Sequence, residues 1–225
     1  MKIFGSFLSI LGMNCVVLGL VLSGSNANAS TGVSYSLDYT FSGTPPSGAA
    51  PWVNVTFEDV TPGTVLLSIY NVSLTGDEFN VDTYLNFNPA KDLSQLSFTY
   101  QNGSSGLQDL SVTKDANNLK ADGDGYFDID VMFATPNDGR FEGGDYITYQ
   151  ITGISDLTAS DFEFMSTSGG GNGDYFAAAK VQGMVMTSTS AWIGATQPVP
   201  EPGSAGLLAL AGGFCWLVRR SKRFA

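Results

Sequence analysis

The chain has 225 residues, of which only 14% are charged, and its formal net charge is −11. All 21 acidic residues but only five of the ten basic residues lie within residues 38–201, so this region carries a net charge of −16. Such a surface repels phosphate backbones, which excludes nucleic acid as a partner. Histidine is absent, and Cys15 and Cys215 lie in apolar terminal segments, so the usual Ser-His and Cys-His nucleophiles are excluded as well.

The first 29 residues have the pattern of a secretory signal peptide. Lys2 supplies a basic start, and residues 8–22 are largely apolar and uncharged. Ala27 and Ala29 then form the small-x-small site at which such peptides are cut. We therefore expect the secretion machinery to export the chain through the inner membrane, and the mature protein to begin at Ser30.

Residues 30–193 are predicted to form one cysteine-free domain, because their apolar residues recur with period two between short turns. In residues 33–41, for example, apolar side chains at every second position share one face. Helix is confined to about one turn near residues 157–161. The pattern is typical of an all-β fold, an antiparallel β-sandwich or jelly roll of about 8–10 strands. The expected strands lie within residues 33–41, 53–57, 65–72, 81–87, 96–100, 126–133, 147–151, 162–164 and 177–187.

Asp122, Asp124 and Asp128 lie in the densest acidic segment of the chain, which glycines interrupt. Carboxylates on a tight, glycine-containing loop are ligands that calcium prefers, so a calcium site is one interpretation. The segment fails the EF-hand pattern, which needs an oxygen ligand where Tyr126 stands. The other interpretation is a solvated turn and strand face, because alternation puts Asp128 and Asp130 opposite the apolar side chains.

Several aromatic residues could stack on a sugar ring, and Tyr84 is the best candidate because alternation points it away from Val81, Thr83 and Leu85. Ordinary core packing is the alternative for all of them. The other aromatic candidates are Tyr35, Tyr39, Trp52 and Tyr100.

A pair of carboxylates could also hydrolyse glycosides, but nothing in the spacing of the acidic residues selects a pair.

The C-terminal segment combines three features in order. After an expected linker at residues 194–199 come Pro200, Glu201 and Pro202, whose prolines fix an extended backbone. Residues 203–218 carry no charge and are slightly short for a transmembrane helix, but a single span is just possible if the arginines that follow snorkel to the interface. A basic cluster follows, which is expected to hold its end on the cytoplasmic side. It consists of Arg219, Arg220, Lys222 and Arg223.

These three features together resemble the PEP-CTERM sorting signal of exported bacterial proteins. The resemblance covers residues 200–225 and implies transient retention in the inner membrane, followed by processing near Glu201 by an exosortase. It also implies association with extracellular polysaccharide or biofilm. We therefore expect a non-enzymatic surface or extracellular-matrix protein without a cofactor. The alternatives are a calcium-assisted carbohydrate-binding module, a glycosidase and, for the tail, a permanent anchor that is never processed.

Overall fold

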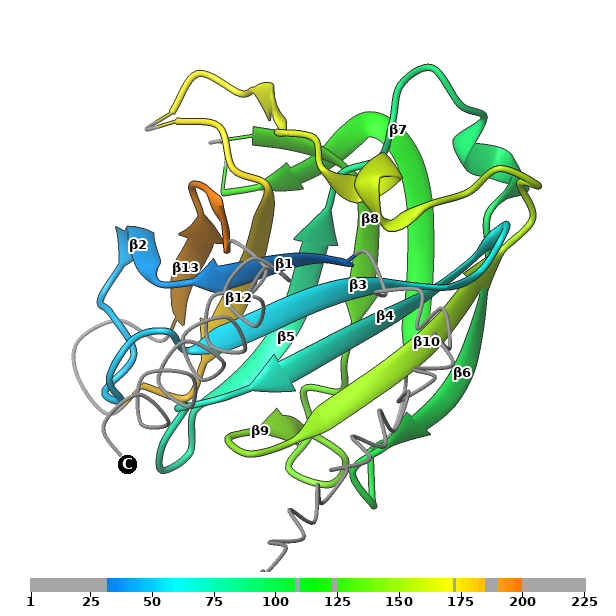
Figure 1. Cartoon of the computed structure of the whole chain (residues 1–225). Coiled ribbons are helices and arrows are strands. Elements are labelled where there is room, and N and C mark those ends of the chain that lie inside the picture. The colour runs from blue at the N-terminus through cyan, green and yellow to red at the C-terminus, as the bar shows by residue number, and fades with distance from the viewer. Residues whose placement is uncertain (1–31, 108–109, 123–124, 172, 185–189, 200–225) are drawn as a thin grey trace, which may run out of the picture.

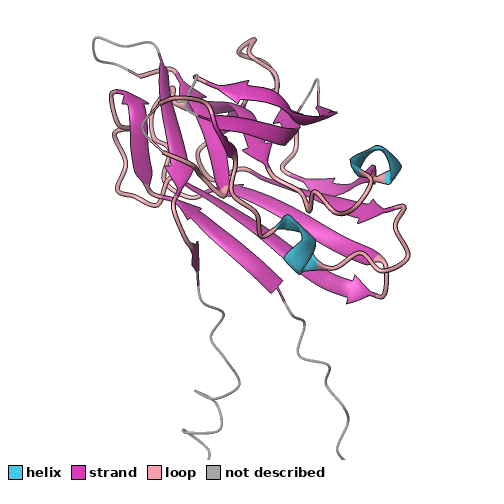
Figure 2. Ribbon diagram, turned by 90° about the horizontal axis from the view of Figure 1, so that it is seen from above, coloured by secondary structure: helices cyan, strands magenta, loops and turns pink. Residues whose placement is uncertain are grey.

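The structure is a computed structural model of the chain. It describes residues 32–107, 110–122, 125–171, 173–184 and 190–199. The expected signal peptide with Ala27 and Ala29, the residue Asp124, and the expected tail at residues 200–225 lie outside the described residues. The described part is an all-β fold of two antiparallel sheets that pack on each other like a sandwich (Figures 1 and 2). Within it, no helix is long and apolar enough to cross a membrane.

The first sheet has six strands, and β4 lies in its interior. In sheet order the strands are β14 (Pro198–Val199), β1 (Gly32–Leu37), β3 (Val53–Thr61), β4 (Thr64–Asn71), β10 (Tyr146–Thr152) and β6 (Ser97–Gly103).

The second sheet has eight strands, two of which branch from the main path. The main path runs through β11 (Thr167–Ser168), β8 (Gly125–Met132), β5 (Phe79–Leu85), β12 (Ala177–Gln182), β13 (Ser190–Ala195) and β2 (Tyr39–Gly43). In addition, β7 (Ser111–Ala121) pairs with β8, and β9 (Phe141–Glu142) pairs with β5. Two short 3₁₀ helices complete the described elements, η1 (Leu93–Gln95) and η2 (Ala159–Phe162), and η2 overlaps the predicted helical turn.

The main core lies between the two sheets and follows from the period-two pattern. In β3, Val53, Val55 and Phe57 are fully buried, while the residues between them are partly exposed. Phe57 stands opposite Leu67 of β4, and Val55 stands opposite Ile69. Each buried side chain of this kind contributes roughly 1.5–3 kcal/mol, so a register slip that turned this face outward would be strongly disfavoured.

The two sides of the sandwich differ. On one side the chain crosses between the sheets twice, from β1 to β2 and from β13 to β14, and β1 also contacts β13. On the other side, the edge strands β6 and β7 pair only with β10 and β8 respectively, and no described residue of one pairs with the other. The sandwich is therefore closed on the first side and open on the second.

Four sequence-based expectations need correction. No strand forms at residues 162–164, because Phe162 ends η2 and no strand follows it directly. The single strand expected at residues 33–41 is two strands, β1 and β2, which separate at Asp38 and belong to different sheets. Residues 194–199, expected as a linker, contain the end of β13 and all of β14. The described residues hold fourteen strands rather than about 8–10, and the long strand β7 is absent from the predicted set. Alternation marks strands, but it does not say where a strand changes sheets.

A second, smaller core covers part of the outer face of the second sheet. Phe41 belongs to this cluster and not to the main core, and its ring stacks on Tyr175 with a centroid distance of 4.5 Å. Leu119 and Trp192 pack against the cluster from its rim. Its buried members are Phe41, Tyr84, Ala121, Phe127, Tyr175 and Ala178.

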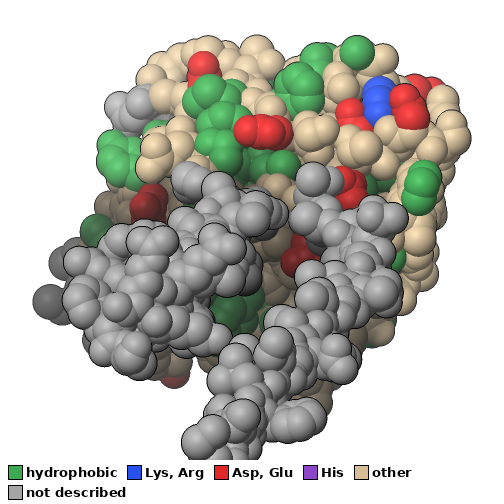
Figure 3. All heavy atoms as spheres, viewed as in Figure 1, with side chains coloured by type: hydrophobic (Ala, Val, Ile, Leu, Met, Phe, Trp, Pro, Cys, Tyr) green, Lys and Arg blue, Asp and Glu red, His purple; other side chains and the backbone are tan. Residues whose placement is uncertain are grey.

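The exposed surface is acidic, as the composition predicts. Acidic side chains are spread over the face seen in Figure 3, and basic side chains are scarce among the described residues visible there. Several tyrosines are also exposed, including Tyr70, Tyr100 and Tyr146, which are 42%, 50% and 40% exposed.

Candidate functional site

The open side of the sandwich holds a cleft, which we call the seam. One wall is formed by β6, η1 and the loop before η1, and the other wall is formed by β7. Lys114 of β7 reaches across, because its ammonium donates to the carbonyl of Ser94 at 3.1 Å and to the carbonyl of Leu96. Two cavities lie along the seam, and Lys114 lines both. A single side chain therefore separates a polar part of the seam from an aromatic part.

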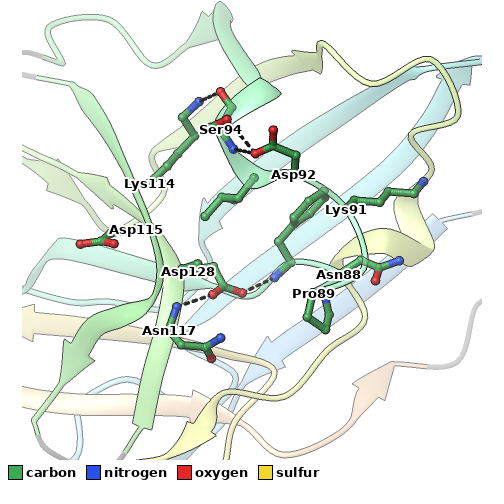
Figure 4. Close-up of a pocket in the computed structure, with 12 residues that line it drawn as sticks. Asn88, Pro89, Lys91, Asp92, Ser94, Lys114, Asp115, Asn117 and Asp128 are labelled. Carbon is green, nitrogen blue, oxygen red and sulfur yellow. Dashed lines mark hydrogen bonds between the residues drawn. The ribbon is translucent and has the colours of Figure 1, made fainter.

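The polar cavity has a volume of about 640 Å³ and opens between the loop after β5 and the middle of β7 (Figure 4). Figure 4 shows Asp128 between these two walls, whereas Lys91 extends away toward η2 and Asp115 points away from the cavity. The charged and amide residues around it are Asn88, Lys91, Asp92, Lys114, Asp115, Asn117 and Asp128.

Asp128 joins the two walls of the polar cavity. Its Oδ2 accepts a hydrogen bond from the backbone N–H of Phe87 at 2.8 Å, and its Oδ1 accepts one from the backbone N–H of Asn117 at 2.7 Å. Asn117 lies in a bulge of β7, and its φ of 50° is in the left-handed region. Because backbone amides occupy both carboxylate oxygens, Asp128 holds the bulge and the loop in place.

The other charges beside this cavity are also paired within the chain. The Lys91 ammonium lies 2.7 Å from Oδ2 of Asp161, whose side chain is only 6% exposed. Asp92 caps η1, accepting hydrogen bonds from the backbone N–H of Ser94 at 3.0 Å and from its hydroxyl at 2.7 Å. Hydrogen bonds and an ion pair within the chain thus fix the walls, so the shape of the cavity does not depend on a ligand.

The aromatic cavity has a volume of about 440 Å³ and lies between β6, β10 and the start of β7. The Tyr149 ring stands edge-on to Phe98 and Tyr100, with centroid distances of 6.4 Å and 6.2 Å. Tyr100 is half exposed, but Tyr149 is only 4% exposed, and its hydroxyl has no hydrogen-bond partner among the described residues. Burial, with a smaller contribution from Tyr100, raises the pKa of Tyr149 to about 12, so the hydroxyl keeps its proton. Buried donors without an acceptor are rare in native proteins.

A different polar group lies on the outer face of the second sheet. Asp130 of β8 stands directly opposite Tyr84 of β5, and Asp82 is its diagonal neighbour. Asp130 is 7% exposed, and its Oδ1 has no hydrogen-bond partner in the described part of the chain. Burial, and then the charge of Asp82, raises the pKa of Asp130 to about 7. Burial also raises the pKa of Asp82, against an opposing effect of Lys180 on β12.

The structure does not gather the predicted calcium ligands. Asp122 is exposed in the turn after β7, and Asp128 is committed to two backbone amides. Asp124 lies outside the described residues. Across residues 32–199, leaving aside the gaps given above, no three acidic side chains come together in a group that could hold a metal ion.

Tyr84 does not offer the exposed ring that the sequence predicts. It does face away from the main core, but the second cluster covers that face, so Tyr84 is only 9% exposed. Its ring packs against Phe127 and Trp192, with centroid distances of 5.7 Å and 5.6 Å. Burial, followed by the charges of Asp130 and Asp82, raises the pKa of its hydroxyl. The prediction of a stacking platform at Tyr84 is therefore wrong.

Sequence reasoning named Tyr100 among the aromatic candidates but missed Tyr149 and Lys114. Tyr149 alternates with Ile147 and Ile151, so it looks like an ordinary core residue, and Lys114 lies in a polar segment with no strand signal. Only the packing of the two sheet edges brings these residues to one cleft.

Comparison with protein-family models, with curated proteins and with solved structures gave no match.

Proposed function

We propose that this chain is an exported, non-enzymatic surface or extracellular-matrix protein, which its C-terminal tail retains in the inner membrane until an exosortase processes it. Two sequence features support export and sorting. One is the small-residue cleavage site at Ala27 and Ala29, and the other is the Pro200, Glu201 and Pro202 motif ahead of an uncharged segment and a basic cluster.

One observation carries the proposal: every described strand lies between the two expected cleavage sites. β1 begins at Gly32, two residues after the expected new N-terminus at Ser30, and β14 ends at Val199, directly before the motif. β1 and β14 also pair with each other, with Ser34 opposite Val199 (Figure 2). Cleavage at both sites would thus remove the two ends and leave every described strand pair intact.

After such processing, the region that remains would be strongly acidic and would leave the membrane. We propose that it then associates with exopolysaccharide or biofilm. The alternative, a calcium-assisted carbohydrate-binding module, has lost support at its predicted residues, because Tyr84 is buried and Asp128 is bonded to backbone amides.

Mass spectrometry of the protein from the producing cells tests the proposal. We expect an N-terminus at Ser30 and a C-terminus near Glu201, and we expect the basic cluster at residues 219–223 to be missing. Glu201→Gln should accumulate in the membrane fraction with its tail intact, whereas the matched variant Glu58→Gln, an exposed residue of β3, should be processed normally. Recovery of the unaltered chain with its tail still in the membrane would show that the tail is a permanent anchor.

A further inference from the structure

We propose that the seam binds a neutral polysaccharide chain, which would contact Tyr100 and Tyr149 in the aromatic cavity and continue past Lys114 into the polar cavity. The inference deepens the proposed association with exopolysaccharide, and it rests on that proposal only for where the ligand is encountered. It also moves the saccharide site away from Tyr84 and removes the need for calcium.

The aromatic cavity supplies the ring faces that a sugar needs. Pyranose rings present patches of C–H groups that pack on aromatic faces, and Tyr100 is half exposed at the mouth of the cavity. Tyr149 contacts its ring edge-on, and Phe98 contacts the ring of Tyr149 in the same way. The exposed ring is therefore carried by a rigid aromatic cluster rather than by a loose loop.

The Tyr149 hydroxyl points to a ligand with oxygen acceptors. It is a protonated, buried donor that no described acceptor satisfies, and its side chain lines the cavity. The hydroxyl itself is covered in the free chain, so a ligand would reach it only after a small shift of the ring. A hydroxyl or ring oxygen of a sugar would then recover the free energy that an unpaired polar group costs. The side chains of Ser97 and Ser111, which also line the cavity, add hydroxyls suited to the same chemistry.

The polar cavity extends the same path and favours a neutral polymer. Asn88 and Asn117 line it with amide groups, which suit the hydroxyls of a sugar. An anionic polymer would be repelled, because residues 38–201 carry a net charge of −16. Two cavities that share Lys114 are suited to a chain of several sugars rather than to a single one.

A peptide is the competing occupant, because β6 and β7 each leave one edge unpaired among the described residues. Strand addition would use backbone hydrogen bonds, and it would not depend on the hydroxyl of Tyr149. Both edges are poorly suited to it. β7 is interrupted by the bulge between Lys114 and Leu119, and the pairing of β6 with β10 is irregular beside Tyr149.

The experiment uses the full-length chain, purified in a detergent without a sugar headgroup. Calorimetry would measure binding of neutral gluco-, manno- and xylo-oligosaccharides of three to six sugars, with polygalacturonate as the anionic control. We expect at least one neutral series to bind, with affinity rising with chain length and unchanged by EDTA. Tyr100→Ala should weaken binding about 10-fold or more. Tyr149→Phe should weaken binding about 5-fold without lowering the melting temperature, because it removes only an unpaired hydroxyl.

Tyr70→Ala is the matched control, because it removes an equally exposed tyrosine that does not line either cavity. It should bind as the unaltered chain does. Three outcomes would overturn the proposal: no binding of any neutral oligosaccharide, binding that Tyr100→Ala and Tyr149→Phe leave unchanged, or equal binding of polygalacturonate. Binding of an extended peptide that is insensitive to Tyr149→Phe would overturn it in favour of strand addition. All of these are distinct from a failure of tail processing, which mass spectrometry reports.

Discussion

Asp128 and Asp130 test how hydrogen bonding changes the effect of a buried carboxylate on the stability of this fold. They lie two residues apart on β8, and each is 7% exposed. Asp128 accepts two short hydrogen bonds from backbone amides, at 2.8 Å and 2.7 Å. Asp130 has an oxygen without a partner among the described residues and faces the like charge of Asp82. We therefore predict that the same substitution, aspartate to asparagine, changes stability in opposite directions at the two positions.

The size of the stability change at Asp130 follows from its pKa of about 7, against an ordinary value of 3.8. The folded chain holds this proton more tightly than the unfolded chain does, so the stability contributed by the group rises as the pH falls from about 7 to about 4. Ionisation of Asp130 in the folded state costs at most about 4 kcal/mol of stability. Because some water still reaches the carboxylate, removing its charge should restore only about 2 kcal/mol. Asp130→Asn should accordingly raise the free energy of unfolding by about 2 kcal/mol at pH 8 and by only about 0.5 kcal/mol at pH 4.5.

Asp128→Asn should instead lower the free energy of unfolding by about 1–3 kcal/mol at pH 8, since the amide nitrogen of asparagine cannot accept from a backbone N–H. Urea unfolding of both variants and of the unaltered chain at pH 4.5 and pH 8 measures these differences. Comparing each variant with the unaltered chain at the same pH cancels the titration of groups far from the two sites. The reasoning is refuted if Asp130→Asn destabilises the chain at pH 8, or if its effect is the same at both pH values.

Two further substitutions test the buried polar contacts that hold the body together. Lys91→Met should lower the free energy of unfolding by about 2 kcal/mol, because it leaves the buried carboxylate of Asp161 without its counter-charge, although Asn88 and Thr158 still donate to it. A loss below about 0.5 kcal/mol in urea would show that the pair behaves as an exposed one. Asn71→Leu should cost about 2–3 kcal/mol, because the fully buried amide donates to the carbonyls of Phe141 at 2.7 Å and Glu142 at 3.1 Å. Thermal unfolding checks the second change, and an unchanged melting temperature would contradict it.

The strands that the sequence predicts well are those with one buried face. Val53, Val55 and Phe57 alternate with polar residues, and the structure buries the three apolar side chains fully. β7 could not be predicted in this way, because as an edge strand with most of its residues exposed it has no continuous apolar face. Its partner β8 dictates its conformation, and that information is not local to the β7 sequence.

Asp130 shows a second limit of local patterns. Alternation correctly puts it on the face opposite the main core, and a two-layer sandwich would leave that face in water. Here the second cluster covers part of it with Phe41, Phe127 and Tyr175, which come from three distant parts of the chain. Burial of Tyr84, the cross-strand neighbour of Asp130, depends on those long-range contacts, so no window of the sequence around Tyr84 contains the cause.

The seam and the two ends of the described chain lie at opposite edges of the first sheet. β14 forms one edge and β6 the other, with four strands between them. Neighbouring strands are about 4.8 Å apart, so the two edges are separated by about 24 Å along the sheet. A tail that continues from Val199 would therefore hold the body by the edge farthest from Tyr100. Because the retained edge and the proposed saccharide cleft do not overlap, retention in the membrane and saccharide binding do not compete for the same surface, and removal of the tail would release the body without altering the seam.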